Sequence, residues 1–450
     1  MIHCESPSRV KDKTRKAGMR KALSREELLA VYDERKEKMS PEEREQTLNK
    51  RLEKQLRYAY KNSPAVREIL DNAGIAPSAI RTVRDLERLP ITTRDDLVDL
   101  QRAWPPFGGF LAEPIGSLDR IYVSPGPVYN IWGPERIYAQ LRSFLRLGFP
   151  RFGDLVLVTQ AYHMVPAGLM LTDVLDLMGC TVVPAGNGQP ELQVKLLYEL
   201  QPTAILGFPS FVVTVLEKAE ELGYDVRRDF SLKFFAGGGE RHIQTLKKVF
   251  EEKYGLVVGD GYGTADVGPV AYCCGRGDGY HYDDEACIVE VVDPDTGKQM
   301  APGEFGQVVV TPFSGVYPLI RLGTGDLASY THEPCRCGRS APRIAGIKRM
   351  VRQHVQVKGM SIHQKELAEA MASLPQILNY QMLLTLDGHK DRITLRISVP
   401  SGIDREGLAS AVNKRCQDVF KLRMDKIEFV SEEAFVGNTE RLADRRWGPA

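Results

Sequence analysis

The sequence predicts an α/β protein with a large N-terminal domain of mostly parallel βαβ sheets plus an antiparallel β subdomain, followed by a small mobile α+β C-terminal domain. Short β-rich runs alternate with helix-length segments between residues 150 and 260, which is typical of a parallel sheet covered on both faces. Residues 286–312 then change to a strand–turn–strand pattern, and a separate α+β pattern follows residue 347. We place the domains at residues 1–346 and 347–450.

Composition limits the partners that this chain can have. With 450 residues, 43% hydrophobic and 26% charged, the chain is ordinary globular material for two domains, or one large domain with an appendage. Lys and Arg total 60 against 59 for Asp and Glu. No global field therefore draws the protein onto nucleic acid or an anionic membrane, and an anionic ligand needs a local site.

The N-terminal segment and the cysteines indicate a soluble cytoplasmic protein. Residues 1–20 are basic and lack an apolar core, so they do not resemble a secretory signal. The most apolar stretch, residues 164–171, is broken by Pro166 and Gly168 and is far shorter than the run of about 18 that spans a bilayer. The 8 cysteines are unevenly spread, unlike a disulfide framework. A homodimer is left open.

The first structured region is helical. Leu48, Leu52, Leu56 and Tyr60 recur every four residues within 41–72, which predicts an amphipathic helix on a larger body, ending near the Asn62-Ser63-Pro64 break. After Pro90, residues 93–96 supply an N-cap and an acidic first turn for another helix.

The βαβ region predicts where a ligand lies. Its expected strands are Leu155–Thr159, Thr181–Pro184, Ala204–Phe208, Leu232–Ala236 and Leu256–Val258, and its expected helices are Leu169–Met178, Leu192–Leu200 and Val212–Leu222. The last two strands lead into Gly237-Gly238-Gly239 and Gly259-Asp260-Gly261-Tyr262-Gly263. Ligands of open α/β sheets bind at the carboxyl ends of strands, so we expect a site at these two glycine-rich exits.

The remaining elements are antiparallel or belong to the small domain. Cys287–Val292 and Gly306–Val310 predict two antiparallel strands joined by a Pro-Asp-Thr-Gly turn. The small domain is expected to contain strands at 355–357, 381–386, 392–399 and 426–430 and helices at 364–374 and 405–420.

Four motifs in order resemble the signatures of the adenylate-forming superfamily. They are Gly237-Gly238-Gly239-Glu240, Tyr262-Gly263-Thr264-Ala265-Asp266, Arg321-Leu322-Gly323-Thr324-Gly325-Asp326-Leu327 and Val357-Lys358-Gly359. The pattern is most similar to the phenylacetate–CoA ligase group, which includes proteins called coenzyme F390 synthetases. The likeness extends from about residue 58 to 446, with weaker support from 89–92 and 208–210.

The resemblance implies a role for each motif. Gly237, Gly238, Gly239 and Glu240 would lie against the adenine of ATP, with Tyr262, Gly263 and Thr264 flanking the base; Asp326 would accept hydrogen bonds from the ribose hydroxyls. Asp266 stands where the family usually has Glu and would hold Mg²⁺. Lys358 would face the site during thioester formation. The alternatives without a ligand are a tight glycine turn for 259–266 and a solvated turn carboxylate for Asp326.

Two segments depart from the family pattern. The phosphate loop is expected near Ser124, but residues 123–130 contain Pro125 and Pro127 and no Lys, so two backbone N–H donors are missing. Ser124 can still donate. At the C-terminus the usual catalytic Lys is absent, and Arg441 is the nearest cation. The alternative for Arg441 is an ordinary surface arginine.

Four further residues suit a structural zinc site. Cys335 and Cys337 lie in one loop, and Cys274 precedes His281 by seven residues, so three sulfurs and one imidazole are available. Phenylacetate–CoA ligase relatives show a similar arrangement at these points. Cys273 is an alternative to Cys274, and the four ligands would leave no open position for catalysis.

The resemblance implies an ATP-dependent carboxylate–CoA ligase. A carboxylate attacks the α-phosphate of ATP, releasing pyrophosphate, and the thiol of coenzyme A then displaces AMP after the small domain rotates about a junction near 346–350. Tyr162, His163 and Pro209, at expected strand exits, would contact an aryl, arylacetic or small organic acid, or are plain core and loop residues. The rival functions are an adenylation-deficient binding relative and an amide-forming ligase.

Overall fold

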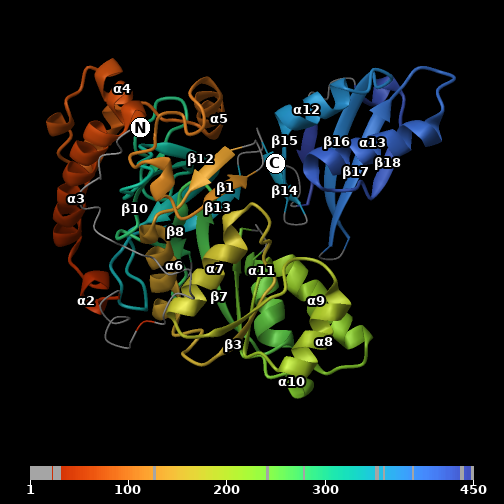
Figure 1. The fold of residues 1–450 in the computed structure, drawn as a ribbon, viewed down its shortest axis with the longest axis horizontal. Helices are drawn as coiled ribbons and strands as arrows, with labels where there is room; N and C mark the ends of the chain where they lie inside the picture. The colour runs from red at the N-terminus through yellow and green to blue at the C-terminus, as the bar shows by residue number, and fades with distance from the viewer. Residues whose placement is uncertain are drawn as a thin grey trace, which may run out of the picture.

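The computed structural model describes residue 23 and residues 32–124, 128–239, 243–276, 279–349, 354–357, 360–387, 390–435 and 440–446. Its main feature is an 11-stranded sheet with the order β10-β11-β12-β13-β9-β8-β7-β6-β5-β3-β4. A separate 4-stranded sheet, β18-β17-β16-β19, lies in the small C-terminal body, drawn in blue in Figure 1. No helix in the described ranges has both the length and the apolar character that crossing a membrane requires.

One half of the large sheet is parallel, as the sequence predicts. Its strands are β4 (Thr181–Pro184), β3 (Leu155–Val158), β5 (Ala204–Leu206), β6 (Phe234–Gly238) and β7 (Val257–Thr264). The helices between them are α7 (Pro166–Leu177), α8 (Pro190–Leu200) and α9 (Pro209–Glu221), and each begins with a proline, which the first turn of a helix tolerates. α10 (Val226–Asp229), α11 (Ile243–Lys248) and a π-helical turn (Val249–Lys253) follow.

Alternate residues of these strands point to two different cores. Val156 and Val158 pack with α6 (Pro134–Leu147) and α7 in one cluster, whereas Leu157 packs with α8 and α9 in another. Successive strand side chains point to opposite faces, so a sheet with helices on both faces needs continuous apolar strands. That requirement explains the unbroken Leu-Val-Leu-Val sequence of β3.

The other half of the sheet is antiparallel. It consists of β8 (Gly268–Tyr272), β9 (Tyr280–Tyr282), β13 (Arg343–Arg349), β12 (Leu322–Thr331), β11 (Gly306–Pro312) and β10 (Cys287–Val292). The predicted β10–β11 pair is confirmed. α3 (Pro41–Asn62) and α4 (Pro64–Asn72) bury Leu52, Leu56 and Leu70 against this half, and Figure 1 shows them along one side of the body.

One sequence expectation about this sheet is wrong. Residues 259–264 were expected to leave a short strand as a loop, but β7 continues through Thr264, because β8 pairs with residues 261–264. A β-carbon on Gly263 would lie 2.5 Å from the carbonyl oxygen of Gly268. Glycine is therefore required here by strand packing as well as by any ligand.

The small body contains the predicted α+β elements. β16 (Asn379–Asp387) and β17 (Lys390–Ser398) form a hairpin, flanked in parallel by β19 (Leu442–Asp444) and β18 (Lys426–Phe429). α12 (Gln364–Ala372) and α13 (Arg405–Phe420) complete its core, beside the hairpin of β14 (His354–Val357) and β15 (Met360–His363). Strand β13 crosses residue 346, so the boundary at this position stays a prediction.

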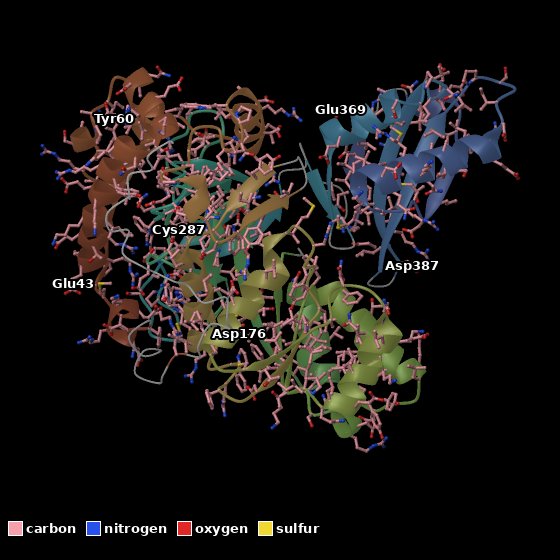
Figure 2. All side chains as sticks on the ribbon, in the orientation of Figure 1. Glu43, Tyr60, Asp176, Cys287, Glu369 and Asp387 are labelled. Atoms are coloured by element: carbon pink, nitrogen blue, oxygen red, sulfur yellow. The ribbon has the colours of Figure 1, made fainter. Side chains whose placement is uncertain are left out.

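Side-chain packing separates the two bodies in the same way. Figure 2 shows Cys287 inside the larger body, whereas Glu369 and Asp387 lie on the body that contains the small sheet. Cys287 is 1% exposed and belongs to the cluster beneath α3, which explains its lack of any partner motif.

Arg321 is a charged side chain buried in the large sheet. It is 1% exposed, and its guanidinium donates to Leu89 O at 2.6 Å and Gly297 O at 2.7 Å and pairs with Glu290 at 3.1 Å. Its own carbonyl accepts from Thr92 N–H at 3.0 Å. Arg321 therefore joins β12, β10 and the chain that enters α5 (Arg94–Ala103).

Replacing Arg321 tests this anchor. We expect Arg321→Met to lower the free energy of unfolding by about 3–5 kcal/mol, because Glu290 and two backbone carbonyls lose their buried partner. The exposed Arg102→Met, whose partner Asp99 is also exposed, should cost less than about 1 kcal/mol. Urea unfolding measures both, and equal costs for the two variants would contradict the anchor.

Candidate functional site

The glycines at the end of β6 bring bare backbone to the sheet edge. A β-carbon on Gly237 would lie 2.4 Å from the carbonyl oxygen of Gly207, and one on Gly238 would lie 2.7 Å from that of Gly261. Gly239 has φ of +81°, which favours glycine. The backbone here can accept a flat group without obstruction by side chains. Glu240, the fourth residue of this predicted motif, lies outside the described residues.

Tyr262 and Asp326 are brought together from two strands. The Tyr262 hydroxyl on β7 lies 2.9 Å from Asp326 Oδ2 and 3.0 Å from Thr324 Oγ1 on β12. Thr324 Oγ1 donates to Val308 O at 3.1 Å and accepts from the Asp326 N–H at 3.2 Å. Asp326 is thus a fixed carboxylate in a strand, and the alternative of a loosely solvated turn residue does not describe it.

Asp260 is a site residue that the sequence did not single out. Its carboxylate lies 3.5 Å from where a Gly238 β-carbon would be, and it accepts hydrogen bonds from the Gly261 N–H at 2.7 Å and the Tyr280 hydroxyl. Burial raises the pKa of Asp260 to about 7, although those two hydrogen bonds oppose the shift. An aspartate between two glycines looked like turn chemistry because the length of β7 was not apparent.

Asp266 has an arginine partner that the motif did not predict. Arg94, at the start of α5, forms a salt bridge with Asp266 Oδ2 and donates to Ser124 Oγ at 3.0 Å. Asn130 donates to the same Ser124 oxygen at 2.7 Å, across the hairpin of β1 (Ile121–Ser124) and β2 (Val128–Ile131). The predicted magnesium carboxylate and the predicted phosphate loop are therefore joined through one guanidinium.

A second arginine lies near the same carboxylate. Arg136, in the first turn of α6, is 4% exposed, and its three side-chain nitrogens have no hydrogen-bond partner among the described residues. Its guanidinium lies 5.6 Å from the ring of Trp132, whose Nε1 donates to Ala265 O at 2.8 Å. Burial lowers the pKa of Arg136 to about 10, with Glu135 and Asp266 opposing, so it stays charged at neutral pH.

Thr264 and Gly263 complete the predicted motif at the end of β7. Thr264 Oγ1 accepts from the Val267 N–H at 3.3 Å, which shapes the turn between β7 and β8. Asp266 lies in this turn, where it is 5% exposed and paired with Arg94. Thr264 therefore has a local structural role, whatever it contacts in a complex.

The three residues predicted for the acid pocket follow neighbouring parallel strands. Tyr162 and His163 follow β3, and Pro209 begins α9 after β5, next to β3 in the sheet. The Tyr162 hydroxyl lies 3.0 Å from Thr172 Oγ1, and a β-carbon on Gly168 would lie 2.9 Å from its ring. Pro209 is buried and His163 is exposed. All three lie on the edge of the sheet that also carries Gly237 and Gly238.

The predicted C-terminal residues differ in position. Arg441, immediately before β19, donates to Tyr380 O at 3.1 Å and Asn379 Oδ1 at 3.2 Å and so binds its own small sheet. Lys358 lies outside the described residues. The prediction from sequence was that Arg441 would face the nucleotide during adenylation and Lys358 during thioester formation.

The predicted metal residues form one cluster. The ligand atoms of Cys274, His281, Cys335 and Cys337 all lie within 4.8 Å of one another. Cys274 Sγ is 3.6 Å from Cys335 Sγ, and Cys337 Sγ is 3.3 Å from His281 Nε2. A tetrahedral zinc with Zn–S bonds of about 2.3 Å requires S···S edges of about 3.8 Å, so this donor set fits zinc.

Two neighbouring contacts select the ligand atoms of this cluster. His281 Nδ1 lies 3.1 Å from Ala341 O, which places a proton on Nδ1 and directs the Nε2 lone pair to the cluster. Burial lowers the pKa of His281 to about 4, so the imidazole is neutral. The sulfur of the alternative ligand Cys273 accepts a hydrogen bond from the Asp260 N–H at 3.2 Å and so faces β7. The geometry favours Cys274.

Buried ion pairs surround the cluster. Tyr272 stacks on His281 with ring centroids 5.8 Å apart, and its hydroxyl donates to Glu37 in α2 (Glu34–Glu37). Glu37 pairs with Arg146 at 2.6 Å and Arg339 at 3.2 Å. The cluster therefore fixes the loops after β8 and β12, and α2 is attached to both.

Known proteins resemble this chain in sequence. Residues 138–313 match the family described as AMP-binding enzyme. A phenylacetate–coenzyme A ligase from Thermus thermophilus is 29% identical over 79% of this chain and 81% of its own, and one from Escherichia coli is 28% identical over 86% and 89%. The chain therefore contains an AMP-binding enzyme domain and is homologous to phenylacetate–CoA ligases over most of its length. The recognition made from four motifs is therefore confirmed.

The solved structures add an arrangement of the two bodies. A 2-hydroxyisobutyryl-CoA ligase with its acyl-AMP and CoA in the thioesterification state superposes with a TM-score of 0.84, at 26% identity over 92% of both chains. The postadenylation state of that ligase, also covering 92% of both chains, gives 0.68. The whole chain therefore superposes better on the thioesterification state of that ligase than on its postadenylation state.

The raised pKa of Asp260 leads to a testable pH dependence. The folded state holds a proton more tightly than the unfolded chain, so this group's stability contribution is complete below about pH 3.8 and is lost as pH rises through about 7. Between pH 5 and pH 8 the free energy of unfolding should fall less in Asp260→Asn than in wild type. We expect the difference between the two falls to be on the order of 2–4 kcal/mol. Exposed Asp95→Asn is the control, and urea unfolding that shows identical slopes for all three proteins would contradict the assignment.

Proposed function

We propose that this chain is an ATP-dependent carboxylate–CoA ligase that forms an acyl-adenylate and then an acyl-CoA thioester. The observation that supports this most directly is the contact of Tyr262 with Asp326 beside the bare backbone of Gly237 and Gly238. An aromatic ring, an unobstructed strand edge and a fixed carboxylate match the base and the ribose diol of one adenine nucleotide.

The residues of the large body bind and orient rather than attack. Asp326 would accept hydrogen bonds from the ribose hydroxyls, while Tyr262 would hold that carboxylate and flank the base. A carboxylate oxygen of the acid then attacks the α-phosphorus, and the bond to pyrophosphate breaks. In the second step the CoA sulfur forms a bond to the acyl carbon, its proton is lost and AMP leaves. No nucleophilic side chain is needed for this sequence.

The small body would supply a different group for each step. Arg441 would approach the nucleotide for adenylation and Lys358 for thioester formation, with a rotation near residues 346–350. In the arrangement seen here Arg441 donates to Asn379 and Tyr380 instead. Exchange of catalytic groups on one binding site by domain rotation explains how one chain performs both steps.

The acid is proposed to be aryl, arylacetic or a small organic acid. Tyr162 and Pro209 would form a mostly apolar wall for the acid, on the sheet edge that carries the glycine backbone. The exposed His163, next to Tyr162 in the sequence, would add a polar group. The names of the relatives refer to phenylacetate and 2-hydroxyisobutyrate. Mg²⁺ would accompany ATP. Asp266 is the carboxylate at the position where the family binds Mg²⁺, although its Oδ2 is paired with Arg94.

The cysteine and histidine cluster is proposed to bind structural zinc. Three sulfurs and a neutral imidazole supply four ligands, so no position is left for substrate. Zinc would tie the loop after β8, which pairs with the Tyr262 strand β7, to the loop after β12, the strand that carries Asp326. Its effect on catalysis would be indirect, through the rigidity of that half of the sheet.

The adenylation step is the first experiment. We expect acid-dependent exchange of pyrophosphate into ATP with at least one member of a panel of aryl, arylacetic and short hydroxy acids, with acyl-adenylate trapped as hydroxamate. Asp326→Asn should reduce kcat/KM by about 10- to 100-fold, because the ribose loses a charge-assisted acceptor. Exposed Asp295→Asn is the matched control.

The other outcomes separate the rival functions. Product formation that needs an amine in place of CoA would identify an amide-forming ligase. Nucleotide binding without pyrophosphate exchange, whichever acid is supplied, would favour the adenylation-deficient relative. The prolines at 125 and 127, which remove backbone donors from the expected phosphate loop, are the reason for that alternative.

The zinc proposal predicts one zinc per chain by elemental analysis. Cys335→Ser and Cys337→Ser should lose the metal and lower the Tm, whereas Cys273→Ser should keep the metal, because its sulfur faces β7. Purified protein with its three cluster cysteines reduced and no bound zinc would remove the proposal.

A further inference from the structure

The geometry points to Arg94 as the residue that binds the nucleotide phosphate, held in place by Asp266 where a magnesium carboxylate is expected. This inference rests on the proposed nucleotide site and adds a positively charged residue that the motifs do not contain. It also gives Asp266 a different role, because its carboxylate orients a protein cation rather than coordinating a metal ion.

The position of Arg94 is set by the main sheet. Thr92 bridges to β12, with its N–H donating to Arg321 O at 3.0 Å and its carbonyl accepting from Gly323 N–H at 2.9 Å. Thr93 then caps α5, accepting from Asp96 N–H at 3.1 Å while Asp96 accepts from Thr93 N–H at 2.8 Å. Arg94 is the first residue of that helix. The backbone of Arg94 is therefore attached, through Thr92, to β12, the strand that also carries Asp326.

The contacts of Arg94 place its charge between two parts of the site. One nitrogen binds Asp266 Oδ2, and another donates to Ser124 Oγ at 3.0 Å. Ser124 ends the strand that enters the expected phosphate loop, and Asp266 follows the strand that carries Tyr262. A guanidinium in this position lies where the phosphates of a nucleotide bound at Tyr262 and Asp326 would extend.

The burial of the pair disfavours a metal ion. The side chains of Arg94 and Asp266 are 15% and 5% exposed, so the carboxylate is neutralised in a poorly solvated place. Mg²⁺ requires octahedral oxygen ligands and keeps several waters, and a Mg²⁺ ion on the other oxygen of Asp266 would lie beside the guanidinium that is bound to Oδ2. Asp266 Oδ1 has no hydrogen-bond partner among the described residues, and the buried Arg136 adds a second positive charge that interacts electrostatically with this carboxylate. Positive charge already surrounds this carboxylate.

The sequence of the phosphate loop explains why such a cation is needed. Residues 123–130 contain no Lys, and two prolines remove backbone donors. Arginine offers five N–H donors in a planar fork that matches phosphate oxygens. Arg94 therefore supplies the charge that the loop lacks, from a helix that is distant in sequence.

Comparing two ligands isolates the phosphate contact. Calorimetry with AMP and with adenosine should show that Arg94→Ala weakens AMP binding by about tenfold or more, while adenosine affinity changes by less than about twofold. Arg94→Lys should retain part of the AMP affinity, since it keeps the charge without the fork. Arg102→Ala, on the exposed face of the same helix, should bind both ligands as wild type does.

Loss of both ligands in Arg94→Ala, or of neither, overturns the role of Arg94. Wild-type protein that binds neither AMP nor adenosine contradicts the proposed function itself, before any variant is compared. The two failures are therefore distinguishable in one set of titrations.

The metal question is tested with Asp266→Asn. If Asp266 orients Arg94, ATP affinity falls by a similar factor with Mg²⁺ and with EDTA. If Asp266 is a magnesium ligand, the loss is confined to the titration that contains Mg²⁺, and that result overturns the inference. A Tm within a few degrees of wild type confirms that each variant compared is folded.

Discussion

The candidate site depends on one buried guanidinium. Arg321 satisfies Glu290 and the carbonyls of Leu89 and Gly297 inside the large sheet, and its own carbonyl receives the N–H of Thr92. These contacts fix β12, which carries Asp326, and the start of α5, which carries Arg94. A buried charge whose three nitrogens all have partners is costly to disturb, so Arg321 holds the two sides of the site to one another.

Glycine has two roles in this molecule, and the structure distinguishes them. Gly237 and Gly263 are required by packing, because a β-carbon at either position would collide with a neighbouring carbonyl. The same absence of side chains leaves backbone exposed at the edge where Tyr262 and Asp326 meet. The fold therefore produces the unobstructed surface, and the aromatic and the carboxylate give it chemistry. Such glycines cannot by themselves identify a ligand.

Local patterns predicted the elements whose burial is periodic, and missed contacts that join distant residues. The runs of β3 to β6 and the helices α7 to α9 followed from hydrophobic spacing, and the cysteine and histidine cluster followed from the limited set of residues that can bind zinc. β8 and β9 are short and aromatic, and β13 begins with a buried arginine, so no period marked them. Arg94 and Asp266 lie 172 residues apart, and no spacing rule relates them.

The two candidate phosphate cations differ in what they are attached to. Arg441 belongs to the small sheet, which would move between the two proposed steps, and in this arrangement it binds Tyr380 and Asn379. Arg94 belongs to the large body and is anchored through Thr92 to β12. A phosphate remains on the adenylate through both steps, so the cation that holds it throughout must not leave with the rotating body. With 60 basic and 59 acidic residues no overall field can substitute for it, and among the described residues of the large body Arg94 is the one that joins Ser124 to Asp266.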